Sequence, residues 1–243
     1  MTTIADDEPI AVAVTEAIHA GDVATLARLL EEDPSLATVR ILQSDCDDDQ
    51  ATDAGRTLLH IATDWPGNFP NGVETVQTLI EAGADVHARF VGSHTETPLH
   101  WAASSDDVKV LDALLDAGAD IEADGAVIGG GTPMADAVAF GQWKAARRLL
   151  ERGARTNLWQ AAALGLLGRV RDELGRPTTV QEDLDNALWC SAHGGQRETA
   201  ELLIDRGADP AWVGHDNLTP AAAAERSEAH ALAEWLRARA GES

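Results

Sequence analysis

The sequence predicts an all-α protein built as a stack of short helix pairs. Apolar residues make up 44% of the chain, but aromatic residues make up only 4% and Tyr is absent. Ala and Leu therefore supply most of the buried surface, which suits closely packed short helices better than a sandwich of sheets. A helix-start signal, two short apolar segments and a Gly-Ala-Asp ending also recur along the chain. A recurring unit of this size predicts a solenoid in which each unit packs on the next.

The clearest copy of this unit covers residues 97–120. Thr97 can cap the first N–H groups of a helix, and Pro98 suits the first helical turn, so a short helix is expected to begin there. Apolar residues at helical spacing follow over 109–115, and Gly118 stands where an ending helix needs a residue that tolerates positive φ. The pattern predicts two helices joined by a tight turn.

The segment Thr97-Pro98-Leu99-His100-Trp101-Ala102 resembles the Thr-Pro-Leu-His-x-Ala signature of the ankyrin repeat. Thr57-Leu58-Leu59-His60-Ile61-Ala62 is a second strong match. The resemblance implies an α-solenoid of about seven stacked helix-turn-helix repeats with short hairpin fingers, which forms a single domain over residues 9–243. It also implies that His60 and His100 tie the start of a helix to the neighbouring turn.

Two acidic segments interrupt or precede the repeats. Residues 1–8 are predicted to be a disordered N-terminus. Residues 43–54 are an acidic loop, and a calcium-binding loop is the alternative. That alternative needs Gly at the sixth position from Asp45 and Glu at the twelfth, where Gln50 and Arg56 stand. The pattern therefore favours a mobile acidic loop.

Three features change the spacing of the repeats. An insertion loop over residues 65–72 adds about seven residues to the second repeat and is expected to be mobile and to bulge outward. The glycine-rich run 125–131 lacks the GxxxxGK[ST] pattern of a phosphate loop and stands where a hairpin finger belongs. Thr156 begins the fifth repeat directly after Arg155, so a finger is missing there.

The charge is strongly negative and unevenly placed. The formal net charge of −23 argues against a nucleic-acid partner, because nucleic-acid affinity depends on Lys and Arg neutralising phosphates. Residues 1–124 hold 25 acidic and 5 basic side chains, whereas residues 144–176 hold 8 basic and 3 acidic ones. This asymmetry either orients a partner with a basic surface or only keeps the helix faces solvated.

Cellular context follows from what the sequence lacks. It has no apolar run of about twenty residues, and its first residues are acidic where a signal peptide is basic, so we expect a cytoplasmic protein without a membrane partner. Cys46 and Cys190 are far apart and fit no zinc spacing, so reduced thiols are predicted and no metal or cofactor is expected.

By resemblance, the function is protein–protein interaction through the concave groove and the finger turns. Trp65 is the first contact candidate, because it lies in an insertion that no repeat core requires and Trp is enriched in binding surfaces. Packing between repeats is an alternative role for Trp101, Trp159 and Trp189. The candidate binding residues are Trp65, Trp101, Asp136, Phe140, Gln160, Trp189 and His193.

The second hypothesis is an enzyme or a small-molecule-binding protein with an aromatic and acidic pocket in the groove. Its acid–base residues would be Asp136, His193 and Asp64, if they converge. The spacing of these residues does not distinguish such a site from solvated surface side chains. For a scaffold, no catalytic residue is expected.

Overall fold

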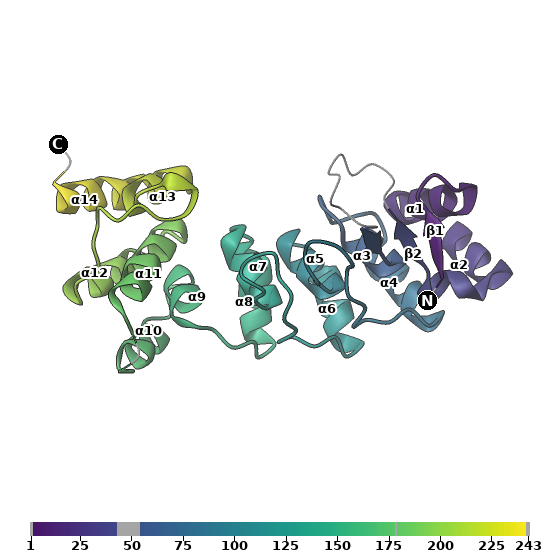
Figure 1. Cartoon of the computed structure of the whole chain (residues 1–243), viewed down its shortest axis with the longest axis horizontal. Coiled ribbons are helices and arrows are strands. Elements are labelled where there is room, and N and C mark those ends of the chain that lie inside the picture. Colours follow the sequence, from purple (N-terminus) through teal and green to yellow (C-terminus); the bar gives the residue numbers. More distant parts are fainter. Residues whose placement is uncertain (1, 43–53, 178, 242–243) are drawn as a thin grey trace. The chain divides into compact units, whose positions relative to one another are not determined.

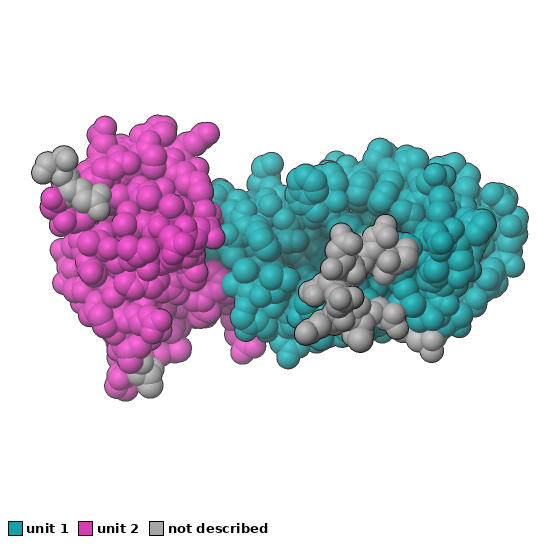
Figure 2. All heavy atoms as spheres, turned by 45° about the horizontal axis from the view of Figure 1, so that its top comes forward, with its two compact units in different colours: residues 1–154 teal, residues 155–243 magenta. Residues whose placement is uncertain are grey.

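The structure, a computed structural model, describes residues 2–42, 54–177 and 179–241. Fourteen α-helices lie in this described part of the chain, and they follow one another in seven pairs (Figure 1). The all-α prediction is confirmed. The chain divides into two compact units, unit 1 over Met1–Ala154 and unit 2 over Arg155–Ser243 (Figure 2). Their boundary falls where the sequence lacks a hairpin finger.

Unit 1 has two layers of helices. Each helix of the inner layer packs on the next, and so does each helix of the outer layer. Leu, Ala, Val and Ile side chains fill the space between the layers. Among them, four leucines are completely buried: Leu26, Leu59, Leu99 and Leu111. The inner helices are α1 (Pro9–Ala20), α3 (Leu58–Thr63), α5 (Pro98–Ser104) and α7 (Pro133–Ala139); the outer helices are α2 (Val23–Glu32), α4 (Gly72–Glu81), α6 (Val108–Asp116) and α8 (Trp143–Glu151).

The starts of the inner helices α3 and α5 each depend on a buried histidine. The backbone N–H of Thr97 donates to Nδ1 of His100 at 3.1 Å, and Nε2 of His100 lies 3.3 Å from the carbonyl oxygen of Gly131 in the next finger. Nε2 of His60 likewise lies 3.1 Å from the carbonyl oxygen of Glu96. Burial lowers the pKa of His60 to about 3 and that of His100 to about 4, so both imidazoles are neutral. The predicted structural role of both histidines is confirmed.

A short sheet precedes the first strong repeat. Its strands are β1 (Thr3–Ala5), β2 (Arg40–Leu42) and β3 (Gly55–Arg56), with β1 parallel to β2 and β2 antiparallel to β3. Gly55 also forms an antiparallel bridge with Val91, so the backbone pairing continues into the finger before α5. A 3-10 helix, η1 (Pro34–Thr38), connects α2 to β2.

The strand β1 differs from the disorder predicted over residues 1–8. The N–H of Arg40 donates to the carbonyl oxygen of Thr2, and the N–H of Asp6 donates to that of Leu42, so the segment is paired at both ends. The side chain of Glu8 accepts the outward N–H of Ala5 at 2.9 Å, which caps the free edge of the strand. The predicted acidic loop at 43–54 lies outside the described residues except for Ala54, which is buried.

Unit 2 has the same alternation of inner and outer helices. The inner helices α9, α11 and α13 pack on one another in that order, and α10 packs on α12. A 3-10 helix, η2 (His215–Asn217), precedes α13. The α-helices of unit 2 are α9 (Leu158–Ala163), α10 (Leu167–Leu174), α11 (Gln181–His193), α12 (Arg197–Asp205), α13 (Pro220–Arg226) and α14 (His230–Ala240). The single domain over residues 9–243 remains a prediction. It states that the two units unfold together. Across the described helices, none combines the length and the apolar character needed to cross a membrane.

Candidate functional site

Trp65 lies at the start of the insertion loop and is 78% exposed. α3 ends at Thr63, and the next residue, Asp64, accepts a hydrogen bond from the backbone N–H of Trp65 at 2.8 Å. Asp64 also forms an ion pair with Arg56 at 2.8 Å. These contacts fix the backbone at the point where the indole leaves the protein surface.

The far end of the insertion loop packs on the preceding repeat. The ring of Phe69 stacks on that of His19, with 4.6 Å between the centroids. The side-chain amide of Asn71 donates to the carbonyl oxygen of Gly21 at 2.9 Å. Gly21 has a φ of 65° and the carbonyl of Pro70 lies directly against it, so a side chain there would clash with the loop.

The middle of the same loop packs on the following repeat. The N–H of Asn68 donates to a carboxylate oxygen of Asp107 at 2.8 Å. Gly67 lies so close to Ser105 that a Cβ at position 67 would come within 2.6 Å of the Ser105 Cβ. The sequence predicts that residues 65–72 bulge outward; the structure instead places them between two neighbouring turns, with Trp65 as the exposed large apolar side chain of the loop.

Phe140 lies on the same edge of unit 1 and is 52% exposed. It follows α7 directly, and the side chain of Gln142 donates to the carbonyl oxygen of Ser104 at 2.9 Å. The turn after α5 therefore lies between the insertion loop and the turn after α7. We call this edge, with Trp65 and Phe140 as its exposed aromatic residues, the loop edge.

The fingers lie at the opposite ends of the same inner helices. Val91 is 45% exposed, Val127 54% and Ile128 37%. The finger over residues 125–131 precedes α7, which is 7 residues long. At 1.5 Å per residue, about 10 Å of inner helix separates this finger edge from the loop edge.

Trp101 is half-buried and belongs to a cluster of rings between α5 and the preceding finger. Its indole lies 5.0 Å from the ring of His60 and 5.6 Å from that of Phe90. His94 stacks on Phe90 with 4.3 Å between the centroids. Trp101 therefore packs between repeats, and only part of its surface is exposed.

Asp136 is completely buried on α7, next to the buried carboxyl of Glu96. Burial, and then the negative charge of Glu96, raise the pKa of Asp136 to about 8. Sequence reasoning did not pair Asp136 with Glu96, because the two residues are 40 positions apart. The acidic residue directly before the Thr-Pro helix start was the available signal.

The three remaining binding candidates lie in unit 2 and have structural partners. Gln160 is 5% exposed and exchanges two hydrogen bonds with Asn157 at the start of α9. Trp189 is 4% exposed, and its indole N–H donates to the carbonyl oxygen of Leu218 at 3.0 Å. His193 lies 5.4 Å from the Trp189 ring, and its Nδ1 is 3.3 Å from the hydroxyl of Ser227.

The acid–base residues of the enzyme hypothesis have separate surroundings. Asp64 is paired with Arg56, and Asp136 lies against Glu96 beneath a finger, both in unit 1. His193 belongs to unit 2. Over the described residues, no group of three His, Cys, Asp or Glu side chains is arranged to hold a metal ion.

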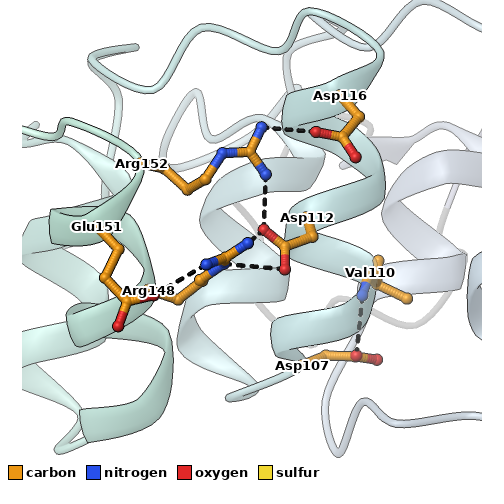
Figure 3. Close-up of polar contacts among 7 residues, drawn as sticks. All are labelled: Asp107, Val110, Asp112, Asp116, Arg148, Glu151 and Arg152. Carbon is orange, nitrogen blue, oxygen red and sulfur yellow. Dashed lines mark hydrogen bonds and ion pairs between the residues drawn. The ribbon is translucent and has the colours of Figure 1, made fainter.

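Part of the basic stretch 144–176 binds α8 to α6 (Figure 3). Arg148 contacts Asp112 at 2.8 Å, and Arg152 contacts Asp112 and Asp116, both at 2.7 Å. Both arginines are thus used inside unit 1 and are not available as a separate basic surface. Sequence reasoning missed this network, although two acids four residues apart on one helix and two arginines four apart on the next were a usable signal.

The comparisons with known proteins agree on the fold. Residues 71–160 match the family model for ankyrin repeats (three copies). The solved human ASB11 ankyrin repeat domain is similar to this chain with a TM-score of 0.52 and 21% sequence identity, over 92% of this chain and 96% of that one. At this identity the likeness concerns the fold alone. The comparison with curated proteins gives no match.

Proposed function

We propose, since this chain contains ankyrin repeats and has the ankyrin-repeat fold, that it is a scaffold that binds another protein through unit 1. Ankyrin repeats are a known protein-interaction scaffold. The partner we propose has a basic surface and contacts both the loop edge and the finger edge. Binding in the cytoplasm, the location that the sequence predicts, is part of this proposal.

The observation that carries the proposal is the placement of Trp65. Its side chain is 78% exposed, although the loop beneath it is held by neighbours on both sides. A large aromatic side chain on an ordered loop loses little conformational entropy when a partner covers it. Trp is also among the residues that most often dominate the binding energy of an interface. Trp65 therefore has the properties of a preorganised anchor.

Charge supports a basic partner. Unit 1 holds 27 acidic and 9 basic side chains, and the α6–α8 network already pairs two of the arginines. An excess of negative charge attracts a positively charged surface and increases the association rate. Because the Debye length is about 8 Å near physiological ionic strength, the association rate should fall as salt increases.

The size of the contact follows from the two edges. Trp65 and Phe140 lie at one end of the inner helices, and Val127 and Ile128 lie at the other, about 10 Å away along the helix axis. A partner that contacts both edges must cross the inner layer over α3, α5 and α7. A helix or a short hairpin of the partner has a suitable width.

The test is a comparison of captured partners. The full chain, Trp65→Ala and Val180→Ala are immobilised and exposed to lysate of the source organism, and bound proteins are quantified by mass spectrometry. Val180 is 59% exposed in unit 2 and is the matched control. Proteins retained by the parent and the control but lost with Trp65→Ala are the expected result.

Truncation of a Trp anchor costs about 2 kcal/mol, so the Kd of a purified partner should rise roughly thirtyfold. Equal binding to all three proteins would contradict the proposal.

The enzyme hypothesis makes a different prediction that the same proteins can test. The purified chain would consume a small molecule from a metabolite mixture with no partner present, and Asp136→Asn or His193→Ala would stop the reaction. Nuclear magnetic resonance spectra of the mixture report such turnover directly. Turnover that depends on either residue would replace the scaffold proposal.

A further inference from the structure

Two carboxyl groups are buried together beneath the finger at residues 125–131. Asp136, on α7, is 0% exposed, and Glu96, just before α5, is 6% exposed. If both were ionised, neither oxygen of Asp136 would have a hydrogen-bond partner of normal geometry among the described residues. Two adjacent carboxylates in a site of low dielectric repel each other strongly, and a single shared proton removes this repulsion and supplies the missing donor.

The same two carboxyls face the backbone of the finger tip. A carboxylate oxygen of Glu96 accepts the N–H of Val127 at 2.8 Å, and the N–H of Ile128 faces Asp136. The other backbone hydrogen bonds of residues 127–130 remain within the finger, for the residues that the structure describes. The attachment of the tip to unit 1 therefore depends on the two acids.

The finger has the backbone freedom to move if this attachment is lost. Gly125, Gly129 and Gly130 have φ values of 110°, 61° and 70°. A Cβ at Gly129 or Gly130 would meet no atom within 4 Å, so the tip is surrounded by open space. Val127 is 54% exposed and Ile128 is 37% exposed, so both side chains lie partly in solvent.

Several other titratable or charged groups lie on the elements around the pair. Nδ1 of His94 lies 3.2 Å from the second carboxylate oxygen of Glu96, and the neutral His100 lies at the start of α5. On α8, Arg148 and Arg152 are directed to the acids of α6. The negative charge that faces Asp136 is that of Glu96.

We propose that a proton shared by Asp136 and Glu96 holds the tip of the finger against unit 1, and that loss of this proton releases the tip. When Asp136 loses its proton, repulsion displaces the Glu96 carboxylate, and the hydrogen bond to the Val127 N–H breaks. The surface that the finger presents then changes with pH. The inference concerns the free protein, so it holds or fails independently of any partner.

The experiment follows the methyl groups of Val127 and Ile128 in the full chain by carbon-13 methyl spectroscopy between pH 6 and 9.5. Methyl signals are suitable because exposed amides exchange too fast with water at high pH. We expect both residues to shift and to become more mobile with one midpoint near pH 8, the pKa of Asp136. The carboxyl carbon of Asp136 should titrate with the same midpoint. Constant methyl signals, or a midpoint different from that of the carboxyl, would overturn the proposal.

Three variants separate this mechanism from a general effect of pH. Asp136→Asn keeps a donor beside Glu96 at every pH, so the methyl titration should disappear. Glu96→Gln keeps an acceptor for Val127 and gives Asp136 a permanent amide donor, so it should have the same effect even if Asp136→Asn folds poorly. Asp124→Asn removes an exposed charge beside the finger and should leave the titration intact. A titration that persists in both pair variants would show that the shared proton does not hold the finger.

Discussion

The guanidinium Nε of Arg148 lies 2.8 and 2.9 Å from the two carboxylate oxygens of Asp112, and this contact joins α8 to α6 (Figure 3). Asp112 also accepts a hydrogen bond from Arg152, so one carboxylate accepts hydrogen bonds from two guanidinium groups. Burial by itself would raise the pKa of Asp112, but the hydrogen bonds and charges of Arg148 and Arg152 together hold it below its usual value. The outer layer of unit 1 is therefore joined by charge as well as by apolar contact.

We expect Asp112→Asn to reduce the free energy of unfolding by roughly 0.5–1 kcal/mol, because all three side chains are partly exposed and water screens the pair. Urea unfolding in low salt measures this loss. Added salt should reduce the difference in unfolding free energy between Asp112→Asn and the parent protein. Lys144→Ala is the control, since Lys144 is 82% exposed and lies 3.7 Å from its partner Asp106. A loss as large for the control would contradict a specific role for Asp112.

The pH dependence of stability should report Asp136. Its pKa is raised to about 8 in the folded chain from 3.8, so between these values the folded state binds a proton that the unfolded state has released. Stability is therefore lost as the pH rises, by up to about 1.4 kcal/mol per pH unit. Urea unfolding at pH 6 to 9 should show that the free energy of unfolding of Asp136→Asn rises relative to that of the parent protein as the pH increases. Parallel curves for the two proteins would contradict the raised pKa, and other titrating groups cancel in the comparison.

Gly67→Ala tests whether the insertion loop is packed. Gly67 has a φ of 69°, and a Cβ there would lie 2.6 Å from the Ser105 Cβ. Gly129→Ala is the matched control, because its φ of 61° costs similar strain but no atom lies within 4 Å. We expect Gly67→Ala to be less stable than the control by at least about 1 kcal/mol, since a clash is added to the strain. Equal thermal stability of both variants would support the mobile, outward loop that the sequence predicts.

Calorimetry tests the prediction of a single domain over residues 9–243. Repeat units stabilise one another through their neighbours, so unit 1 and unit 2 should unfold in one transition. The calorimetric and van't Hoff enthalpies should then agree. Two separate transitions, with fragments 1–154 and 155–243 each reproducing one of them, would show instead that the units fold independently.

The sequence alone determined the features that depend on neighbouring residues. Thr97 and Pro98 specify a helix start whatever surrounds them, and Gly118 permits the positive φ that ends the second helix. The role of His100 could be predicted because His100 belongs to the segment that resembles the ankyrin-repeat signature, and the resemblance implies this role. The exposure of Trp65 followed from an insertion that no repeat core needs.

Only the tertiary structure decided which distant residues meet. It placed Glu96 beside Asp136, Arg148 beside Asp112, and the insertion loop between the turns at Gly21 and Ser105. It also paired Thr3–Ala5 with a strand more than thirty residues away. The physical reason is that each contact depends on how one repeat is rotated and shifted on the next. Apolar packing between the layers sets that geometry, and helical periodicity in the sequence does not encode it.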